Sequence, residues 1–562
     1  MKITKILTFA VLSALLAGNL TAQDFDDFGF DDFGSDSSSS GGSSLPIEFS
    51  GDLKLDVRDY VTNGDVDGIG DTKITATPSA KLGVKYDGGK AGADLQLKVN
   101  EDTIKNHPID VIDELTLSAY LGNLTLSAGK MKVVWGKGDK LHVIDNFNAD
   151  DLSDFIIPDY LDRRISTPMI RGVYAVPLNS RTVSNVMIEG VYTPIMPVDR
   201  FGTGIWSPRE ANKLTSTVKT SATEMLKSIT TAKVTSNELA TRINTLYTEY
   251  LALQKVGQPT EAAAQATYGA LSQLIKDNYT TLEKYGYNGQ ISTLKEALTN
   301  YVAATETLYL TALNNSSSLA AGVYPDTNKF EYGQGGLRLT GTIGQVDLGV
   351  SYYYGHYKRP SFDAMKMASY VSSYLATGKG DDKFLAYDKK QTFGVEFSTI
   401  LWKFNLRGEG CYNLTDDVAG DDPWVHNNSI QWLGGFDIDL PFWDANLNVQ
   451  ETGTYILKND KIEDSIYKTL DVDYSSTGYS NNKLVVNFTT SFLNGKLAPE
   501  VTALYGFEHK DLVVMPKVTI KPASSFKVIG SGLAMWTNDE KESEFGEWHK
   551  NSFVQLAAEV SF

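Results

Sequence analysis

Charged side chains recur at every second position in many short segments of this 562-residue chain. Side chains at alternate positions of a β-strand share one face, so these charges would line one surface of a sheet. The candidates for that lining are Lys54, Arg58, Lys98, Arg338, Asp347, Glu396, Lys403, Arg407, Glu409, Asp437 and Lys527. Both signs occur in similar number, which favours a weakly selective ionic lining over a dedicated anion or cation filter. Pairing of these charges across the wall is an equally open alternative.

A second charged group lies in a segment without alternation, where Asp159 and Asp162 precede Arg163 and Arg164. If this segment folds inward, Arg163 and Arg164 would narrow a pore and set an electrostatic barrier. A solvated surface loop is the other interpretation that the sequence allows.

Catalytic and metal-binding patterns are weak. The six histidines show no metal-ligand spacing, and His142 with Asp145 alone does not indicate a catalytic triad. Residues 63–68 match the first half of a calcium loop, but Ile74 stands where a bidentate glutamate belongs, so a glycine-rich turn is favoured. The sequence therefore predicts no enzyme, no catalytic residue, no cofactor and no metal site.

The elements that must position the charges are strands. Eighteen segments between residues 47 and 562 alternate in polarity, and short connections such as 87–90, 122–123 and 344–345 interleave with mostly longer loops. No run of 18 apolar residues follows residue 22, so no membrane helix is expected. The pattern predicts an all-β membrane protein over 47–562: a closed antiparallel transmembrane β-barrel of 16–18 strands, with eighteen favoured.

The last twelve residues, 551–562, alternate and stop at Phe562. This ending resembles that of bacterial outer-membrane β-barrel proteins, whose final aromatic residue is read by the barrel-insertion machinery. The resemblance implies the outer membrane of a diderm bacterium, with lipid and that machinery as partners. A homo-oligomer is also allowed. The closing strand must pair with the strand that begins near Ile47, so that no open edge faces lipid.

The N-terminal region carries an export pattern. Lys2 and Lys5 precede an apolar run, and a small-residue cleavage pattern ends at residue 22, so 1–22 is predicted to be a signal peptide. Residues 23–46 form an acidic Phe/Ser/Gly tail that we expect to be disordered. A net charge of −18 makes the chain a poor candidate for nucleic-acid binding.

One long loop contains three successive sequence motifs: Trp135-Gly-Lys-Gly-Asp139, then Asp145-Asn-Phe-Asn-Ala-Asp-Asp151, then Asp159-Tyr-Leu-Asp-Arg-Arg164. These thirty residues resemble a segment of porin-like outer-membrane families related to the alginate-export channel. The resemblance implies that this loop folds inward.

A second loop, 207–322, abandons the two-residue period. Capping-box patterns at 207–210 and 235–238 predict helix starts, and Gly257, Gly286 and Gly289 mark stops. Leu239, Ile243 and Leu246 begin a narrow apolar seam. We therefore expect a helical insertion of three or four helices, lying outside the cell or plugging the pore.

These patterns favour a porin-like channel for passive diffusion of small hydrophilic solutes. The alternative is a surface-exposed adhesin or interaction protein whose barrel anchors the helical insertion.

Overall fold

The computed structural model describes residues 46–61, 74–139, 141–178, 180–202, 204–258, 260–319, 323–380, 383–539 and 543–562. The predicted signal peptide, the predicted tail up to residue 45 and the calcium-like motif at 63–71 lie outside these residues.

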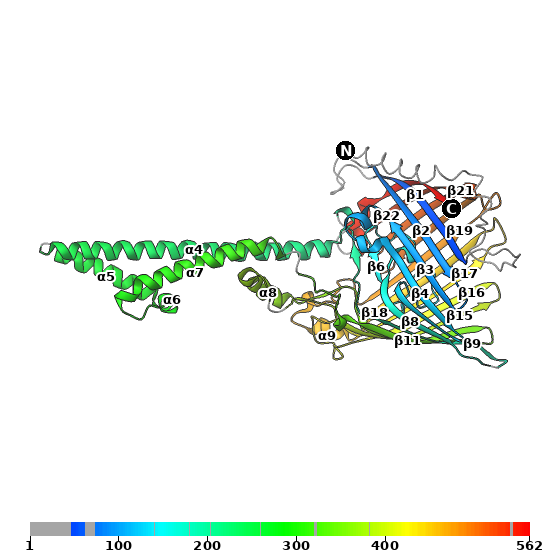
Figure 1. Ribbon diagram of the computed structural model, residues 1–562, viewed down its shortest axis with the longest axis horizontal. Helices are drawn as coiled ribbons and strands as arrows, with labels where there is room; N and C mark the ends of the chain where they lie inside the picture. Colours follow the sequence, from blue (N-terminus) through cyan, green and yellow to red (C-terminus); the bar gives the residue numbers. More distant parts are fainter. Residues whose placement is uncertain are drawn as a thin grey trace.

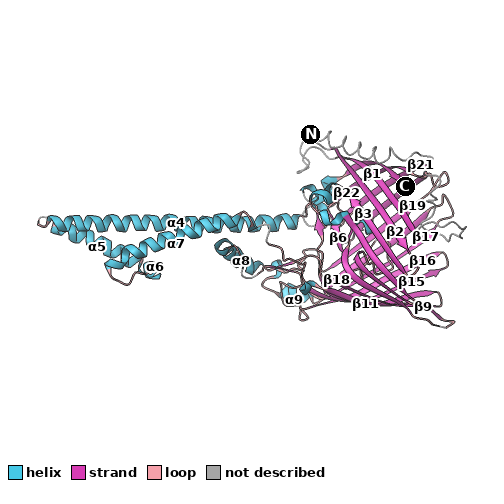
Figure 2. Cartoon of the chain, in the orientation of Figure 1, coloured by secondary structure: helices cyan, strands magenta, loops and turns pink. Residues whose placement is uncertain are grey.

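Eighteen antiparallel strands close into one barrel, as predicted (Figures 1 and 2). In chain order they are β1 Ile47–Tyr60, β2 Ile74–Asp87, β3 Ala91–Val99, β4 Ile112–Leu121, β5 Leu124–Met131, β8 Thr167–Ala175, β9 Val183–Thr193, β11 Gln334–Ile343, β12 Val346–His356, β15 Lys389–Leu401, β16 Phe404–Thr415, β17 Ser429–Asp439, β18 Asn446–Ile456, β19 Ser480–Thr489, β20 Leu497–Gly506, β21 Leu512–Ala523, β22 Phe526–Trp536 and β23 Phe553–Ser561. The predicted closure is confirmed, because β23 pairs with β1 in a register that sets Ala557 opposite Asp56.

The outer surface of the barrel is apolar. Large side chains such as Phe49, Leu117, Leu337, Val395 and Leu556 are exposed there, while their sequence neighbours point to the lumen. Exposed apolar side chains are favourable in hydrocarbon, and a closed antiparallel barrel leaves no backbone group unpaired in lipid. The barrel therefore lies in an outer membrane.

The two ends of the barrel differ. Connections between β4 and β5, β11 and β12, and β15 and β16 are tight turns at one end. The other end carries long loops with short elements: α2 Glu101–Lys105, η1 Pro108–Val111, β6 Ala149–Leu152, α3 Tyr160–Arg163, β7 Arg164–Ile165, β10 Arg200–Phe201, η2 Gly204–Trp206, η4 Phe330–Tyr332, β13 Ser361–Phe362, α8 Ala364–Thr377, β14 Leu385–Ala386, α9 Asn459–Asp464, η5 Lys468–Leu470 and η6 Gly546–Asn551. We call these the turn end and the loop end.

A helical arm extends from the loop end, away from the strands (Figure 1). It comprises α4 Arg209–Val256, α5 Glu261–Asp277, α6 Tyr279–Lys284 and α7 Ile291–Ser316. With 48 residues, α4 is about 70 Å long at about 1.5 Å per residue. Leu239 and Ile243 pack against Leu271 and Leu298 far from the barrel.

The predicted helix start at 235–238 is wrong, because α4 runs through it without a break. Thr235, the predicted cap, lies inside α4, and the hydroxyl of the next residue, Ser236, lies 2.7 Å from the Thr305 hydroxyl of α7. The stop at Gly257 is confirmed by its φ of 72°.

The base of the arm packs on another loop. Val218 of α4 and Ala312 of α7 share a buried cluster with Tyr370 and Leu375 of α8, which belongs to the loop between β12 and β15. In the part of the chain that the structure describes, no helix combines the length and the apolar character needed to cross a membrane.

Candidate functional site

The connection between β5 and β8, residues 132–166, lies inside the barrel, and we call it the inner segment. Asp154 is 2.6 Å from Arg58 of β1, and Asp162 is 2.5 Å from Lys81 of β2. On the other side of the barrel, Asn146 accepts a hydrogen bond of 2.6 Å from Lys390 of β15. Because the inner segment contacts inward-facing side chains on strands far apart in the barrel, it crosses the lumen.

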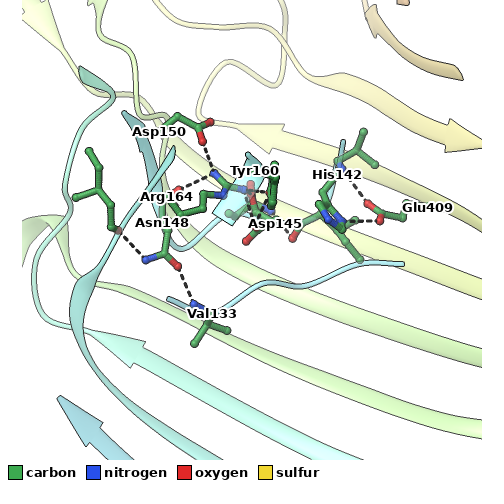
Figure 3. A network of polar contacts seen from close by, with 12 residues as sticks. Val133, His142, Asp145, Asn148, Asp150, Tyr160, Arg164 and Glu409 are labelled. Carbon is green, nitrogen blue, oxygen red and sulfur yellow. Dashed lines mark hydrogen bonds and ion pairs between the residues drawn. The ribbon is translucent and has the colours of Figure 1, made fainter. Parts of the chain in front are cut away.

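Glu409 of β16 anchors the inner segment (Figure 3). Its Oε1 accepts hydrogen bonds of 2.7 Å from the backbone N–H groups of Lys137 and Gly138, and lies 2.9 Å from His142 Nδ1. Its Oε2 accepts a bond of 2.8 Å from the Val143 N–H. The carboxylate side chain is fully buried. One wall carboxylate thus holds a whole turn of the inner segment.

Local packing explains the residue types in the sequence Trp135-Gly-Lys-Gly-Asp139. Trp135 is buried and packs edge-on against Phe147, with 4.9 Å between ring centroids. Gly136 has a φ of 123°, and a Cβ there would collide with the Glu409 carboxylate. A Cβ on Gly138 would collide with a backbone carbonyl. The glycines therefore let the backbone wrap closely around Glu409.

Asp139, at the end of this sequence, makes a second tie to β16 and a first one to β18. It forms an ion pair with Arg407 of β16 and accepts a hydrogen bond of 2.6 Å from Asn448 of β18. Arg407 also pairs with Asp437 of β17.

A second polar network joins the two ends of the inner segment to its middle (Figure 3). Arg164 lies 2.5 Å from Asp145 and 3.2 Å from Asp150, and the Tyr160 hydroxyl donates to Asp145 at 2.6 Å. Asn148 accepts from the Val133 N–H at 2.9 Å. Burial disfavours the charge of Arg164, but the attraction of Asp145 outweighs it and raises the pKa of Arg164. Arg164 is thus a structural cation of the inner segment.

Arg163 lies over the ring of Tyr160, 5.9 Å from its centre, and makes no ion pair that the described residues show. Burial lowers the pKa of Arg163, and its Nε has no hydrogen-bond partner among the described residues. The two adjacent arginines therefore play different parts.

A mixed-charge cavity remains between the inner segment and the wall. It has a volume of about 320 Å³ and is lined by Lys81, Gln96, Leu97, Asp113, Glu114, Lys132, Val134, Leu161 and Asp162. Lys132 lies 2.9 Å from Asp113, and the half-exposed Lys81 and Asp162 face each other. Burial alone would raise the pKa of Asp162, but Lys81 outweighs it, so that pKa is lowered. The lining mixes charged and apolar side chains, and its net charge is close to neutral.

Apolar side chains fill the lumen beside β19 to β23. Phe155 of the inner segment stacks on Trp206 at 5.2 Å between ring centroids. Both belong to a buried cluster with Val513 and Leu533 of the wall. This cluster lies at the loop end of these strands, whereas the pairs Lys517–Glu500 and Lys527–Glu559 lie on the same strands nearer the turn end.

The predicted lining residues fall into several groups. Those that contact the inner segment are Arg58, Lys98, Asp347, Arg407 and Glu409. Those that pair within the wall include Arg338 with Glu396 at 2.5 Å, Lys527 with Glu559 at 2.7 Å, Lys54 with Asp56 at 3.0 Å, and Asp437 with Arg407. Several of these charges thus pair within the wall, as one alternative predicted, and the lining of a solute path by the others stays a prediction.

Lys403 is placed differently from its prediction. It lies in the tight turn between β15 and β16, next to Trp402, whose φ is 59°. The prediction that Lys403 lies on the lumen face of a strand is wrong, because the chain reverses direction at this position. Lys403 is exposed at the turn end and is no part of the wall.

The sequence did not single out His142, Asn148 or Tyr160 as functional, and they act through contacts within the inner segment or with Glu409. Among the residues with described positions, no three His, Cys, Asp or Glu side chains are arranged to share a metal ion. The single cysteine, Cys411, is buried with its Sγ 3.4 Å from the Val143 carbonyl.

No family model and no curated protein matches the sequence. Solved structures with a similar arrangement include Pseudomonas aeruginosa OccK3 (OpdO), with 7% identity, a TM-score of 0.39 and coverage of 92% of this chain and 95% of that one. The outer membrane channel DcaP of Acinetobacter baumannii has 9% identity, a TM-score of 0.35 and coverage of 92% and 97%. A variant of Rh. blastica porin has 9% identity, a TM-score of 0.33 and coverage of 92% and 100%. Each of these TM-scores lies below 0.5.

Proposed function

We propose that the protein is an outer-membrane channel through which small hydrophilic solutes diffuse passively. The observation that carries this proposal is the inner segment, which crosses the lumen and is tied to opposite walls by Glu409 and Arg58. A wide barrel without such a segment would hold an open aqueous pore. With the segment in place, the polar space beside Lys81 and Asp162 is the route that the lining favours.

The charge balance of this route supports weak ion selectivity. Lys81 and Lys132 stand against Asp113, Glu114 and Asp162 around the cavity, which gives two cations and three anions. Mixed charges at short range lower the barrier for both signs of ion without holding either one. Size, set by the distance between the inner segment and β2 to β4, is then the main filter.

The test is the conductance of the purified full chain in planar lipid bilayers. Stepwise currents in potassium chloride are expected, and Asp162→Ala should raise the conductance because it removes a side chain from the mouth of the cavity. Glu559→Ala, at a wall position that does not touch the inner segment, is the matched control. Absence of any current steps from correctly folded protein would exclude the channel.

The helical arm favours a second candidate, a surface-interaction protein anchored by the barrel. The arm leaves the loop end and reaches far beyond the barrel, with its described apolar contacts to the rest of the chain at its base. Replacing residues 207–322 with a short linker separates the two functions. Unchanged conductance with lost binding to surfaces would assign interaction to the arm, whereas a larger conductance would make the arm a gate.

A further inference from the structure

Two lysines at the loop end of the barrel stand without a carboxylate partner. Lys358 lies two residues beyond the end of β12, and Lys390 is the second residue of β15. Within the described part of the chain, neither ammonium group has a carboxylate oxygen within the 4.0 Å of an ion pair. Their hydrogen-bond acceptors are neutral amides, since Lys358 donates to Gln334 Oε1 and Lys390 donates to Asn146 Oδ1 at 2.6 Å.

The two ammonium groups border the same tyrosine. The Tyr353 hydroxyl donates to the same Gln334 oxygen that accepts from Lys358. Lys390 Nζ lies 5.8 Å from the centre of the Tyr353 ring and 5.0 Å from that of Tyr357. Aromatic faces stabilise a cation but do not neutralise it. The two ammonium groups therefore lie beside the inner segment with neutral amide oxygens as their described hydrogen-bond acceptors.

Carboxylates near this pair include Asp145, Asp150 and Asp199. The three carboxylates are already engaged. Arg164 holds Asp145 and Asp150, and Arg359 lies 3.2 Å from Asp199.

A buried charge without a counter-charge is unfavourable and is normally compensated. Burial, together with the nearby Lys390, lowers the pKa of Lys358 well below its ordinary value. Both lysine residues nevertheless keep part of their surface exposed. The missing compensation points to an anion that visits the site.

We infer that Lys358 and Lys390 form an oxyanion subsite of the channel, which takes the carboxylate or phosphate group of a solute. The inference rests on the proposed channel, since it places the subsite beside the solute path. Gln334 is buried and donates to the Ile195 carbonyl at 3.3 Å, so its oxygen is directed toward Lys358. Asn146 donates to the Ile144 carbonyl at 3.0 Å, which directs its oxygen toward Lys390. The two amides thus hold both ammonium groups in place, and as neutral groups they do not neutralise the charge of the lysines.

The test is isothermal titration calorimetry of the detergent-solubilised full chain, in one titration with malonate and in a second titration with inorganic phosphate. We expect saturable binding that weakens at least about tenfold in Lys358→Gln and in Lys390→Gln, which corresponds to about 1.4 kcal/mol. Lys403→Gln, at the turn end, is the matched control and should bind as the wild type does. Binding of malonate alone identifies the carboxylate as the preferred group, and binding of phosphate alone identifies the phosphate.

The subsite would be overturned if neither malonate nor phosphate bound. It would also be overturned if Lys358→Gln and Lys390→Gln bound as the wild type does. Folding is checked by circular dichroism during heating. Because each substitution removes an uncompensated charge, the melting temperature of the unliganded variants should not fall, and malonate or phosphate should raise that of the wild type alone. Conductance in potassium chloride is measured separately. If the protein conducts but binds neither anion, the subsite is refuted and the channel stands. If it binds an anion but does not conduct, the channel is refuted.

Discussion

Replacing Glu409 with glutamine should release the inner segment from the wall while leaving the barrel intact. Glu409 accepts hydrogen bonds from three backbone N–H groups and contacts His142. Glutamine has no charge and only one acceptor oxygen, so its amino group must face at least one N–H donor. The segment then loses its strongest fixed point.

The magnitude follows from these bonds. Hydrogen bonds to a charged group contribute about 1 kcal/mol more than neutral ones, and an unsatisfied buried N–H costs about 1–3 kcal/mol. Three weakened bonds and one unsatisfied donor give about 4–6 kcal/mol of lost anchoring free energy. At the lower figure the ratio of released to anchored segment rises about a thousandfold.

The assay combines single-channel recording with hydrogen exchange. We expect Glu409→Gln to give larger and noisier current steps, and residues 137–143 to exchange their amide hydrogens faster. Glu559→Gln makes the same chemical change on β23, where the carboxylate pairs with Lys527 at 2.7 Å, and should change neither quantity. Unaltered conductance and unaltered exchange in Glu409→Gln would refute the anchoring role.

Three further predictions follow. Gly136→Ala should loosen the inner segment in the same assays, because a Cβ there collides with the Glu409 carboxylate; wild-type behaviour would show that the turn adapts. Leu271→Ala should destabilise the arm by about 2–5 kcal/mol, seen as a lower first transition in the helical circular-dichroism signal with an unchanged barrel transition; a single shifted transition would contradict an independent arm. Burial opposes the charge of His426, but Asp473, 2.9 Å away, outweighs it and raises the pKa of His426. The stability that wild type has over His426→Gln should therefore be full below about pH 6.5 and fade as pH rises through the folded value, measured by melting temperatures from pH 5 to 9; a difference that grows with pH would contradict this.

The wall of the barrel was readable from the sequence because strand geometry repeats every two residues. Arg58 and Glu409 were placed on the inner face by alternation alone. The same rule failed at Lys403, since alternation does not indicate where a chain reverses, and Trp402 begins a tight turn there. The capping pattern at 235–238 failed as well, because α4 continues through it and Ser236 contacts Thr305 of α7.

The inner segment was less predictable. Its glycines and charges suggested that it folds inward, but Glu409 lies 272 residues from Lys137 in the chain. Pairings across such distances leave no periodic signal in a single sequence. Lys358 and Lys390 were missed for the same reason, since their unpaired state depends on where Asp145, Asp150 and Asp199 are engaged.

The most direct test of the channel is modification of a cysteine beside the cavity. Asp162→Cys places a thiol where the inner segment faces Lys81, and the native Cys411 is buried, so the wild type serves as the control for the reagent. In a planar bilayer, adding a thiol-reactive trimethylammonium compound should reduce the current of Asp162→Cys and leave that of the wild type unchanged. Steady current in Asp162→Cys after complete modification, shown by mass spectrometry, would contradict a solute path along the inner segment.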